Sequence, residues 1–361
     1  MALRELVTID PPINPEYSDM EKECWKFLNS IPSETSSFIS STLHINNVKL
    51  LIGLPTSPTH VYLSHFATTG KYDKSRGLVI IYYISGYENL VLRTLVHEVG
   101  HVYFEQKSGE TKDVPENIRI LLKVIDESIP NYFVLRYRCD ESFINYIDGL
   151  INILEKHIIK EGVVYQTGYI IAPRLVSYAL YLYGITEEDI NKIAKDPPYV
   201  LEILMRTKEE KLRKAIASVL YSVGLINEEG LKKFGYSAKD YKTISIERLL
   251  ELLPEENLDN LTIKVFMAIA GLIKLAITLG REKVYSMFKK IFEKLRRIDF
   301  VHNYFQVIFS ARSDMLGTFL DAIDATIPGT LDMIDSLNTK EIIELVCKTF
   351  GLPHDDYKEI E

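Results

Sequence analysis

Two histidines one helical turn apart, with a glutamate directly after the first, carry the clearest chemistry in the sequence. The pattern is His97-Glu98-Val99-Gly100-His101, and apolar residues recur around it at helical spacing. On a helix the two histidines share one face, so their ring nitrogens can bind one metal ion. Glu98 lies about 100° round the helix axis, beside the ion, where its carboxylate can take a proton from metal-activated water. The pattern therefore predicts a zinc site with Glu98 as general base.

The helix that presents this pattern is expected between Asn89, which can cap its start, and Gly109, which can end it. Gly100 lies between the histidines and leaves room for another element to pack closely. The alternative to a metal site is a pair of helix histidines that bind carbonyl groups on either side of an unrelated glutamate.

Composition sets limits on the class of protein. The chain has 361 residues, of which 47% are hydrophobic, enough for one large core or two of medium size. Its net charge of -8 argues against nucleic acid as a partner. The first residues lack the apolar core of a signal peptide, so the expected location is the cytoplasm. Three scattered cysteines indicate neither a disulfide framework nor a cysteine zinc site.

The chain is expected to fold as an α+β protein in two parts. Three short β-rich runs predict a small sheet before the histidine helix, and residues 71–77 are expected to join the last two as a hairpin. The runs are Val48–Ile52, Val61–Phe66 and Leu78–Tyr83, and residues 1–17 are expected to be an irregular lead-in. A double proline suggests a boundary, with residues 1–197 as one domain and 198–361 as a helical domain.

One helical segment of the second part has the length of a membrane span. It runs from Leu261 to Gly280, but Lys264 and Lys274 lie within it. Because lysine is costly inside a bilayer, we expect a buried helix of a water-soluble fold and no membrane partner.

A strand pair, then His97-Glu98-x-x-His101, then a glutamate on a second helix resembles the gluzincin metallopeptidases, which include thermolysin and the zinc aminopeptidases. The resemblance implies a zincin-like catalytic domain, a zinc ion and a peptide or protein substrate. It also implies an exposed edge strand that pairs with the substrate backbone, as unpaired strand edges can. The matching segment is residues 64–70, with four substrate-binding residues: Ala67, Thr68, Thr69 and Gly70. The alternative is an edge that a neighbouring loop covers.

The same resemblance points to Glu127 as the third zinc ligand. The run from Glu127 to Tyr132 is similar to the Glu-Gly-x-Ala-x-Tyr signature of many gluzincins, although Ser128 and Pro130 replace its glycine and alanine. A near-copy contains Glu141, and on one continuous helix the two glutamates would lie roughly 21 Å apart, too far to share a metal. Glu127 matches better; Glu141 and Glu105 are the alternatives.

Two further residues have expected supporting roles. Tyr165 begins a Tyr-x-x-Gly run that resembles the oxyanion-stabilising tyrosine of the aminopeptidase branch, with Tyr169 and His302 as alternatives and an ordinary core position also open. Asp126 is either a hydrogen-bond acceptor for a ligand histidine or a solvated carboxylate.

These features predict a zinc-dependent peptidase. The alternatives are a zincin-like scaffold that binds a partner through its helical half, and a zinc hydrolase that acts on a non-peptide amide or ester. Substrate profiling separates the last of these from a peptidase. The sequence does not determine an oligomeric state.

Overall fold

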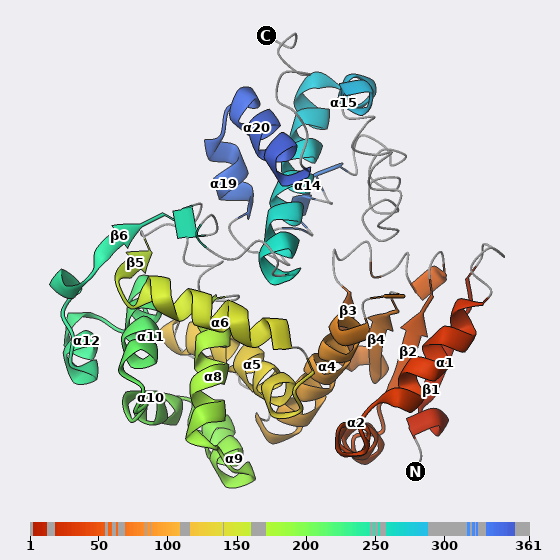
Figure 1. Ribbon diagram of the computed structural model, residues 1–361, viewed down its shortest axis with the longest axis horizontal. Coiled ribbons are helices and arrows are strands. Elements are labelled where there is room, and N and C mark those ends of the chain that lie inside the picture. The colour runs from red at the N-terminus through yellow and green to blue at the C-terminus, as the bar shows by residue number, and fades with distance from the viewer. Residues whose placement is uncertain are drawn as a thin grey trace.

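The computed structural model describes most of the chain, and within that part the protein is a mostly helical α+β fold with a small mixed sheet near the N-terminus (Figure 1). The described residues are 3–12, 19–54, 57–59, 63, 69–83, 85–86, 88–108, 116–139, 141–159, 171–245, 248–249, 252, 258–287, 316–317, 320–321, 323 and 330–350.

The sheet has the strand order β1-β2-β4-β3. Its strands are β1 (Val7–Asp10), β2 (Lys49–Gly53), β3 (Gly70–Asp73) and β4 (Leu78–Tyr82). β1, β2 and β4 are parallel, whereas β3 is antiparallel to β4 and forms one edge. A hairpin does precede the histidine helix, but its first strand is β3, which lies largely within the predicted turn, and not the expected run Val61–Phe66. A short 3-10 helix, Lys74–Arg76, joins β3 to β4 and ends at Gly77, whose φ of 61° suits a residue without a side chain.

Two expectations about strands are wrong. β1 lies inside the segment expected to be irregular, because four residues that pair with a strand some forty positions away leave only a weak local signal. The run Val61–Phe66 was expected to be a strand, but Leu63, its one described residue, is helical. Leu63 is buried against Ile80 and Tyr82 of β4, so its hydrophobicity serves to cover one face of the sheet.

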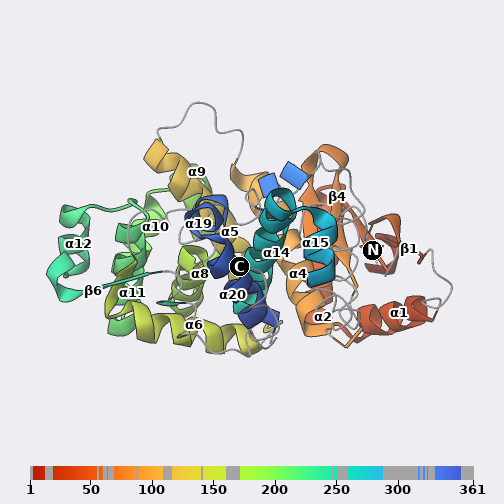
Figure 2. The same ribbon diagram turned by 90° about the horizontal axis from the view of Figure 1, so that it is seen from above.

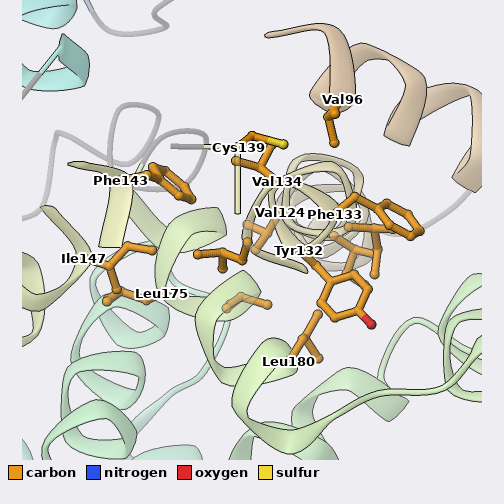
Figure 3. Close-up of a cluster of buried hydrophobic side chains, with 14 of the residues drawn as sticks. Val96, Val124, Tyr132, Phe133, Val134, Cys139, Phe143, Ile147, Leu175 and Leu180 are labelled. Atoms are coloured by element: carbon orange, nitrogen blue, oxygen red, sulfur yellow. The ribbon is translucent and has the colours of Figure 1, made fainter. Parts of the chain in front are cut away.

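The helices that follow the sheet build the main core. α4 (Glu88–Ser108) carries the histidine pattern, and α5 (Glu116–Arg136) packs between α4 and α8 (Ala172–Tyr183). α1 (Met20–Ser30) and α2 (Ser33–Ile45) lie beside the sheet (Figure 1). The buried side chains between α4, α5, α6 (Glu141–Leu154) and α8 form one cluster (Figure 3), which includes Val96, Val124, Phe133, Val134, Phe143, Ile147, Leu175 and Leu180.

Packing continues across residue 197. α9 (Glu187–Lys195) contacts α10 (Tyr199–Met205), and α11 (Glu210–Ser222) packs on α6, α8 and α12 (Glu228–Phe234). Buried residues on both sides of the expected boundary belong to one hydrophobic cluster. The two-domain division stays a prediction. β5 (His157–Ile159) and β6 (Lys242–Ile244) form a separate parallel pair that the sequence patterns did not predict.

The last described helices lie together (Figures 1 and 2), and Met267 of α14 belongs to the main hydrophobic cluster. α14 (Leu258–Leu279) contacts α15 (Arg281–Met287), α19 (Thr330–Ser336) and α20 (Thr339–Phe350). Lys274 of α14 donates to the carbonyl oxygen of Ile334 at 2.8 Å and pairs with Asp335 at 2.9 Å. In the part of the chain that the structure describes, no helix combines the length and the apolar character needed to cross a membrane.

Candidate metal centre

Three side chains from two helices converge at one point. His97 and His101 lie one turn apart on α4, and Glu127 lies on α5, which packs against α4. The Nε2 atoms of the two histidines are 3.1 Å apart. Glu127 places Oε2 3.2 Å from Nε2 of His97 and Oε1 3.8 Å from Nε2 of His101. This cluster could hold a metal ion.

The spacing of these atoms suits a small tetrahedral ion. Zinc binds imidazole nitrogen and carboxylate oxygen at about 2.0–2.2 Å, so ligand atoms at tetrahedral angles lie roughly 3.3–3.5 Å apart. The three observed separations, 3.1, 3.2 and 3.8 Å, bracket that range. The side chains are partly exposed, 20% for His97, 16% for His101 and 35% for Glu127, so solvent reaches the cluster.

The other ring nitrogen of each histidine faces an acceptor. Nδ1 of His97 lies 3.1 Å from Oδ1 of Asn131, and Nδ1 of His101 lies 3.5 Å from Oδ1 of Asp126. These acceptors assign the proton of each neutral ring to Nδ1 and leave a lone pair on each Nε2. Two nitrogen lone pairs and a carboxylate then face one another, an arrangement that a cation stabilises. The donor set therefore fits a metal ion by its chemistry as well as its spacing.

Without a metal ion, protons balance this charge. Burial disfavours the charged form of His101, but its hydrogen bond to Asp126 and the negative charges of Glu127, Asp126 and Glu98 prevail and raise its pKa to about 10. Burial also opposes ionisation of Glu127, yet the charge of His101 and the close contact with His97 lower its pKa to about 2. A proton on His101 thus occupies the place that a metal ion would take in the charge balance.

The two helices approach closely enough because Gly100 has no side chain. A Cβ on Gly100 would lie 2.6 Å from Cα of Pro130 and 3.0 Å from its Cβ. Pro130 lies inside α5, one turn after Glu127. The expectation that Gly100 admits a close neighbour is confirmed. Ser128, the other departure from the gluzincin signature, is buried, and its hydroxyl donates to the carbonyl oxygen of Val124.

Glu98 faces the edge strand β3. Its Oε2 accepts a hydrogen bond from the main-chain N–H of Tyr72 at 2.7 Å. Burial raises the pKa of Glu98, while the neighbouring histidines and the Tyr72 hydrogen bond lower it to a smaller extent. A raised pKa suits a carboxyl group that must both accept and release a proton. Nearby, the hydroxyl groups of Thr69 and Thr94 lie 3.3 Å apart, which also ties the start of β3 to α4.

The two alternatives for the third ligand were Glu141 and Glu105. Glu141 begins α6, so it and Glu127 lie on different helices and not on one continuous helix. Glu105 forms an ion pair with Lys74 of the hairpin.

The predicted substrate segment, residues 64–70, only touches the described edge strand. Gly70 is the first residue of β3 and Thr69 directly precedes it, so the described strand lies after the predicted segment. Ala67 and Thr68 lie outside the described residues, as do the oxyanion candidates Tyr165, Tyr169 and His302.

Sequence reasoning missed two residues beside the cluster, Asn131 and Tyr72. Asn131 lies four positions after Glu127, so helical spacing places it on the ligand face, and this signal was available in the sequence. Tyr72 contributes a main-chain group, for which no residue type gives a signal.

No protein-family model matches this chain, and the searches of curated proteins and of solved structures also find no match.

Proposed function

We propose that the protein is a zinc-dependent peptidase with a gluzincin-like, zincin-type catalytic domain. The observation that carries the proposal is the convergence of His97, His101 and Glu127, with the neighbouring Glu98 hydrogen-bonded to an edge strand. Two imidazoles and one carboxylate are a ligand set of catalytic zinc sites, which keep a fourth position for water or substrate.

Zinc in this place would lower the pKa of a water molecule that it binds to about 7 and polarise the carbonyl oxygen of the substrate. Glu98 has one oxygen held by the N–H of Tyr72, which leaves Oε1 to take a proton from the attacking water. The water oxygen adds to the peptide carbonyl carbon, the C–N bond breaks, and Glu98 delivers the proton to the nitrogen of the departing amine. The products are a carboxylic acid and an amine.

The other residues in the proposal bind or orient the substrate. An extended peptide would lie along the edge of the sheet near Thr69 and Gly70, with Ala67 and Thr68 continuing the contact. Tyr165 would donate its hydroxyl proton to the oxygen that gains negative charge. Asn131 and Asp126 would keep the ligand histidines in the tautomer that binds metal.

The test is the metal content of the purified protein combined with cleavage of a peptide library. We expect one zinc per chain and cleavage by the wild type. Glu98→Gln should retain zinc and lose turnover, because the amide cannot accept the proton. Glu88→Gln, on the same helix but at its first residue, serves as the matched control and should keep both properties.

An active Glu98→Gln protein would overturn the mechanism, and a wild type that binds no zinc when supplied with it would overturn the site. Bound zinc without peptide cleavage would direct the search to non-peptide amides and esters, or to a scaffold role.

A further inference from the structure

We propose that Tyr72 is the positioning residue for Glu98: its main-chain N–H fixes one carboxylate oxygen, so that the other is presented for proton transfer. This inference rests on the proposed peptidase function for its catalytic meaning, whereas the contact itself is tested separately below. It assigns a role to a residue that lies on the edge strand, far in sequence from the histidine pattern.

The amide of Tyr72 is directed away from the sheet. The N–H of Tyr82 donates to the carbonyl oxygen of Thr69 at 2.8 Å, so Thr69 and Tyr82 form a hydrogen-bonded pair of the antiparallel ladder. Hydrogen-bonded and non-hydrogen-bonded pairs alternate along an antiparallel strand. The backbone of Lys71, two residues after Thr69, therefore also bonds to β4, whereas the amide of Tyr72 points to the outer edge of the sheet. There it meets Oε2 of Glu98 at 2.7 Å. A hydrogen bond to a carboxylate is about twice as strong as one between neutral groups, so the contact can hold the side chain.

A second carboxylate of α4 holds the side chain of Tyr72. The hydroxyl group of Tyr72 hydrogen-bonds to Glu105, and this bond, together with burial and the charge of Glu105, raises the tyrosine pKa to about 12. Glu105 also pairs with Lys74. Glu98 and Glu105 are seven residues apart and therefore lie on one face of the helix, two turns from each other. β3 is thus attached to α4 through both the backbone and the side chain of one residue.

Gly70 lets the strand come this close. A Cβ on Gly70 would overlap Cγ2 of Thr94 and lie 3.1 Å from Cγ of Glu98. Any side chain at this position would push β3 away from α4 and lengthen the contact between Tyr72 and Glu98. The absence of a side chain at Gly70 thus lets the outward amide of Tyr72 reach the carboxylate of Glu98.

The contact also limits how a peptide can pair with β3. The N–H of Tyr72 is the donor that an added strand would use at this point, and Glu98 already accepts it. A peptide therefore cannot accept the hydrogen bond of the Tyr72 amide while Glu98 accepts it.

Substitution of Tyr72 by proline isolates the amide. Tyr72→Pro removes the N–H without removing a bond to β4, and proline is tolerated on edge strands where the N–H faces outward. Tyr72→Ala is its matched control, since it loses the phenol and keeps the N–H. We expect both variants to keep zinc, and Tyr72→Pro to have a kcat about 10²-fold below that of Tyr72→Ala with little change in KM. Equal kcat values would overturn the positioning role.

Amide hydrogen exchange tests the contact without substrate or metal. In the wild type, the Tyr72 amide should exchange slowly although it lies on the outer edge of the sheet. Glu98→Ala should speed this exchange at least tenfold and leave the Lys71 amide, which faces β4, unchanged. Unchanged exchange at Tyr72 in Glu98→Ala would overturn the inference even if Glu98 proves essential for turnover. Faster exchange in Glu98→Ala, together with a wild type that cleaves no peptide, would count against the peptidase proposal alone.

A second pair of variants covers the case in which Tyr72→Pro does not fold. Gly70→Ala should speed exchange at Tyr72 and lower kcat with every amide still present. Thr94→Ser, added to Gly70→Ala, removes the overlapping Cγ2 methyl group. The double variant should therefore recover part of the slow exchange at Tyr72 and part of the kcat. Wild-type exchange and kcat in Gly70→Ala would show that the spacing of β3 and α4 does not govern Glu98.

Discussion

Gly100 of α4 and Pro130 of α5 meet almost backbone to backbone, since a Cβ on Gly100 would lie 2.6 Å from Cα of Pro130. Gly100 lies between the two histidines, and Pro130 follows Glu127 by one turn. This close approach of the two helices therefore lies beside the place where their three ligand atoms converge. The distance between imidazole nitrogens and carboxylate oxygens depends on the absence of one methyl group.

Gly100→Ala should reverse the usual effect of this substitution. In an open helix position, alanine is favoured over glycine by about 1 kcal/mol. Here the new methyl group would overlap Pro130 and force the helices apart, which we expect to lower the free energy of unfolding by about 1–3 kcal/mol. Thermal unfolding of the metal-free variant measures this, and zinc affinity should fall with it. An increase in stability would show that the helices are farther apart than described.

Glu127→Ala should abolish stoichiometric zinc binding, and Glu141→Ala should leave it intact. Glu127 places its oxygens 3.2 and 3.8 Å from the histidine nitrogens, whereas Glu141 begins a different helix. Metal analysis after dialysis against a weak chelator measures the difference. Zinc retained in Glu127→Ala and lost in Glu141→Ala would exchange the two assignments.

Asn131→Ala should weaken zinc binding about 10- to 100-fold, the usual cost of losing a partner that orients a ligand histidine. Asn131 faces Nδ1 of His97 at 3.1 Å, and alanine would leave the ring free to turn and to change tautomer. Asn131→Asp keeps an acceptor at the same place and is the control. Competition with a chelating dye gives both affinities; equal affinities for the alanine and aspartate variants would contradict an orienting role.

The local parts of this site were predictable from the sequence. Helical spacing alone places His97, Glu98 and His101 around one point, and the apolar pattern predicts the helix that carries them, although α4 begins at Glu88, one residue before the expected cap Asn89. Glu127 was found through its likeness to a known signature, because no local rule relates it to residues some thirty positions earlier.

The parts that depend on tertiary packing were not predictable. β1 owes its existence to β2, and its four residues lie next to prolines that indicate an irregular segment. Leu63 has the side chain expected in a strand but covers β4 from a helix, since burial by itself does not distinguish the two. Tyr72 acts through a main-chain group whose direction depends on the register of the hairpin. In each case the missing information was which distant segment lies alongside.

The metal-free protein should lose stability as the pH rises above neutrality. The pKa of His101 is raised from 6.5 to about 10, so its stabilising contribution is complete below about pH 6.5 and is lost as the pH approaches about 10. The pKa of Glu127 is lowered from 4.5 to about 2, so its contribution is present above about pH 4.5 and is lost only in strong acid. The pair therefore stabilises the metal-free fold most between these limits, from about pH 4.5 to about pH 6.5.

The stability that zinc binding adds should increase as the pH rises, opposite to the stability of the metal-free protein. The reason is that a metal ion must displace the proton from His101 before it can bind. We expect zinc affinity to rise between about pH 6.5 and pH 9, and each binding event to release a proton. Melting temperatures of the metal-free and zinc-loaded protein across this range, with calorimetry in buffers of different ionisation enthalpy, measure both effects. Glu127→Gln, which removes one charge facing His101, should make the melting temperature of the metal-free protein depend less on pH. A metal-free melting temperature that stays constant from pH 6.5 to pH 9 would mean that His101 carries no proton in the folded chain, and that Asp126 and Glu127 do not hold it as described.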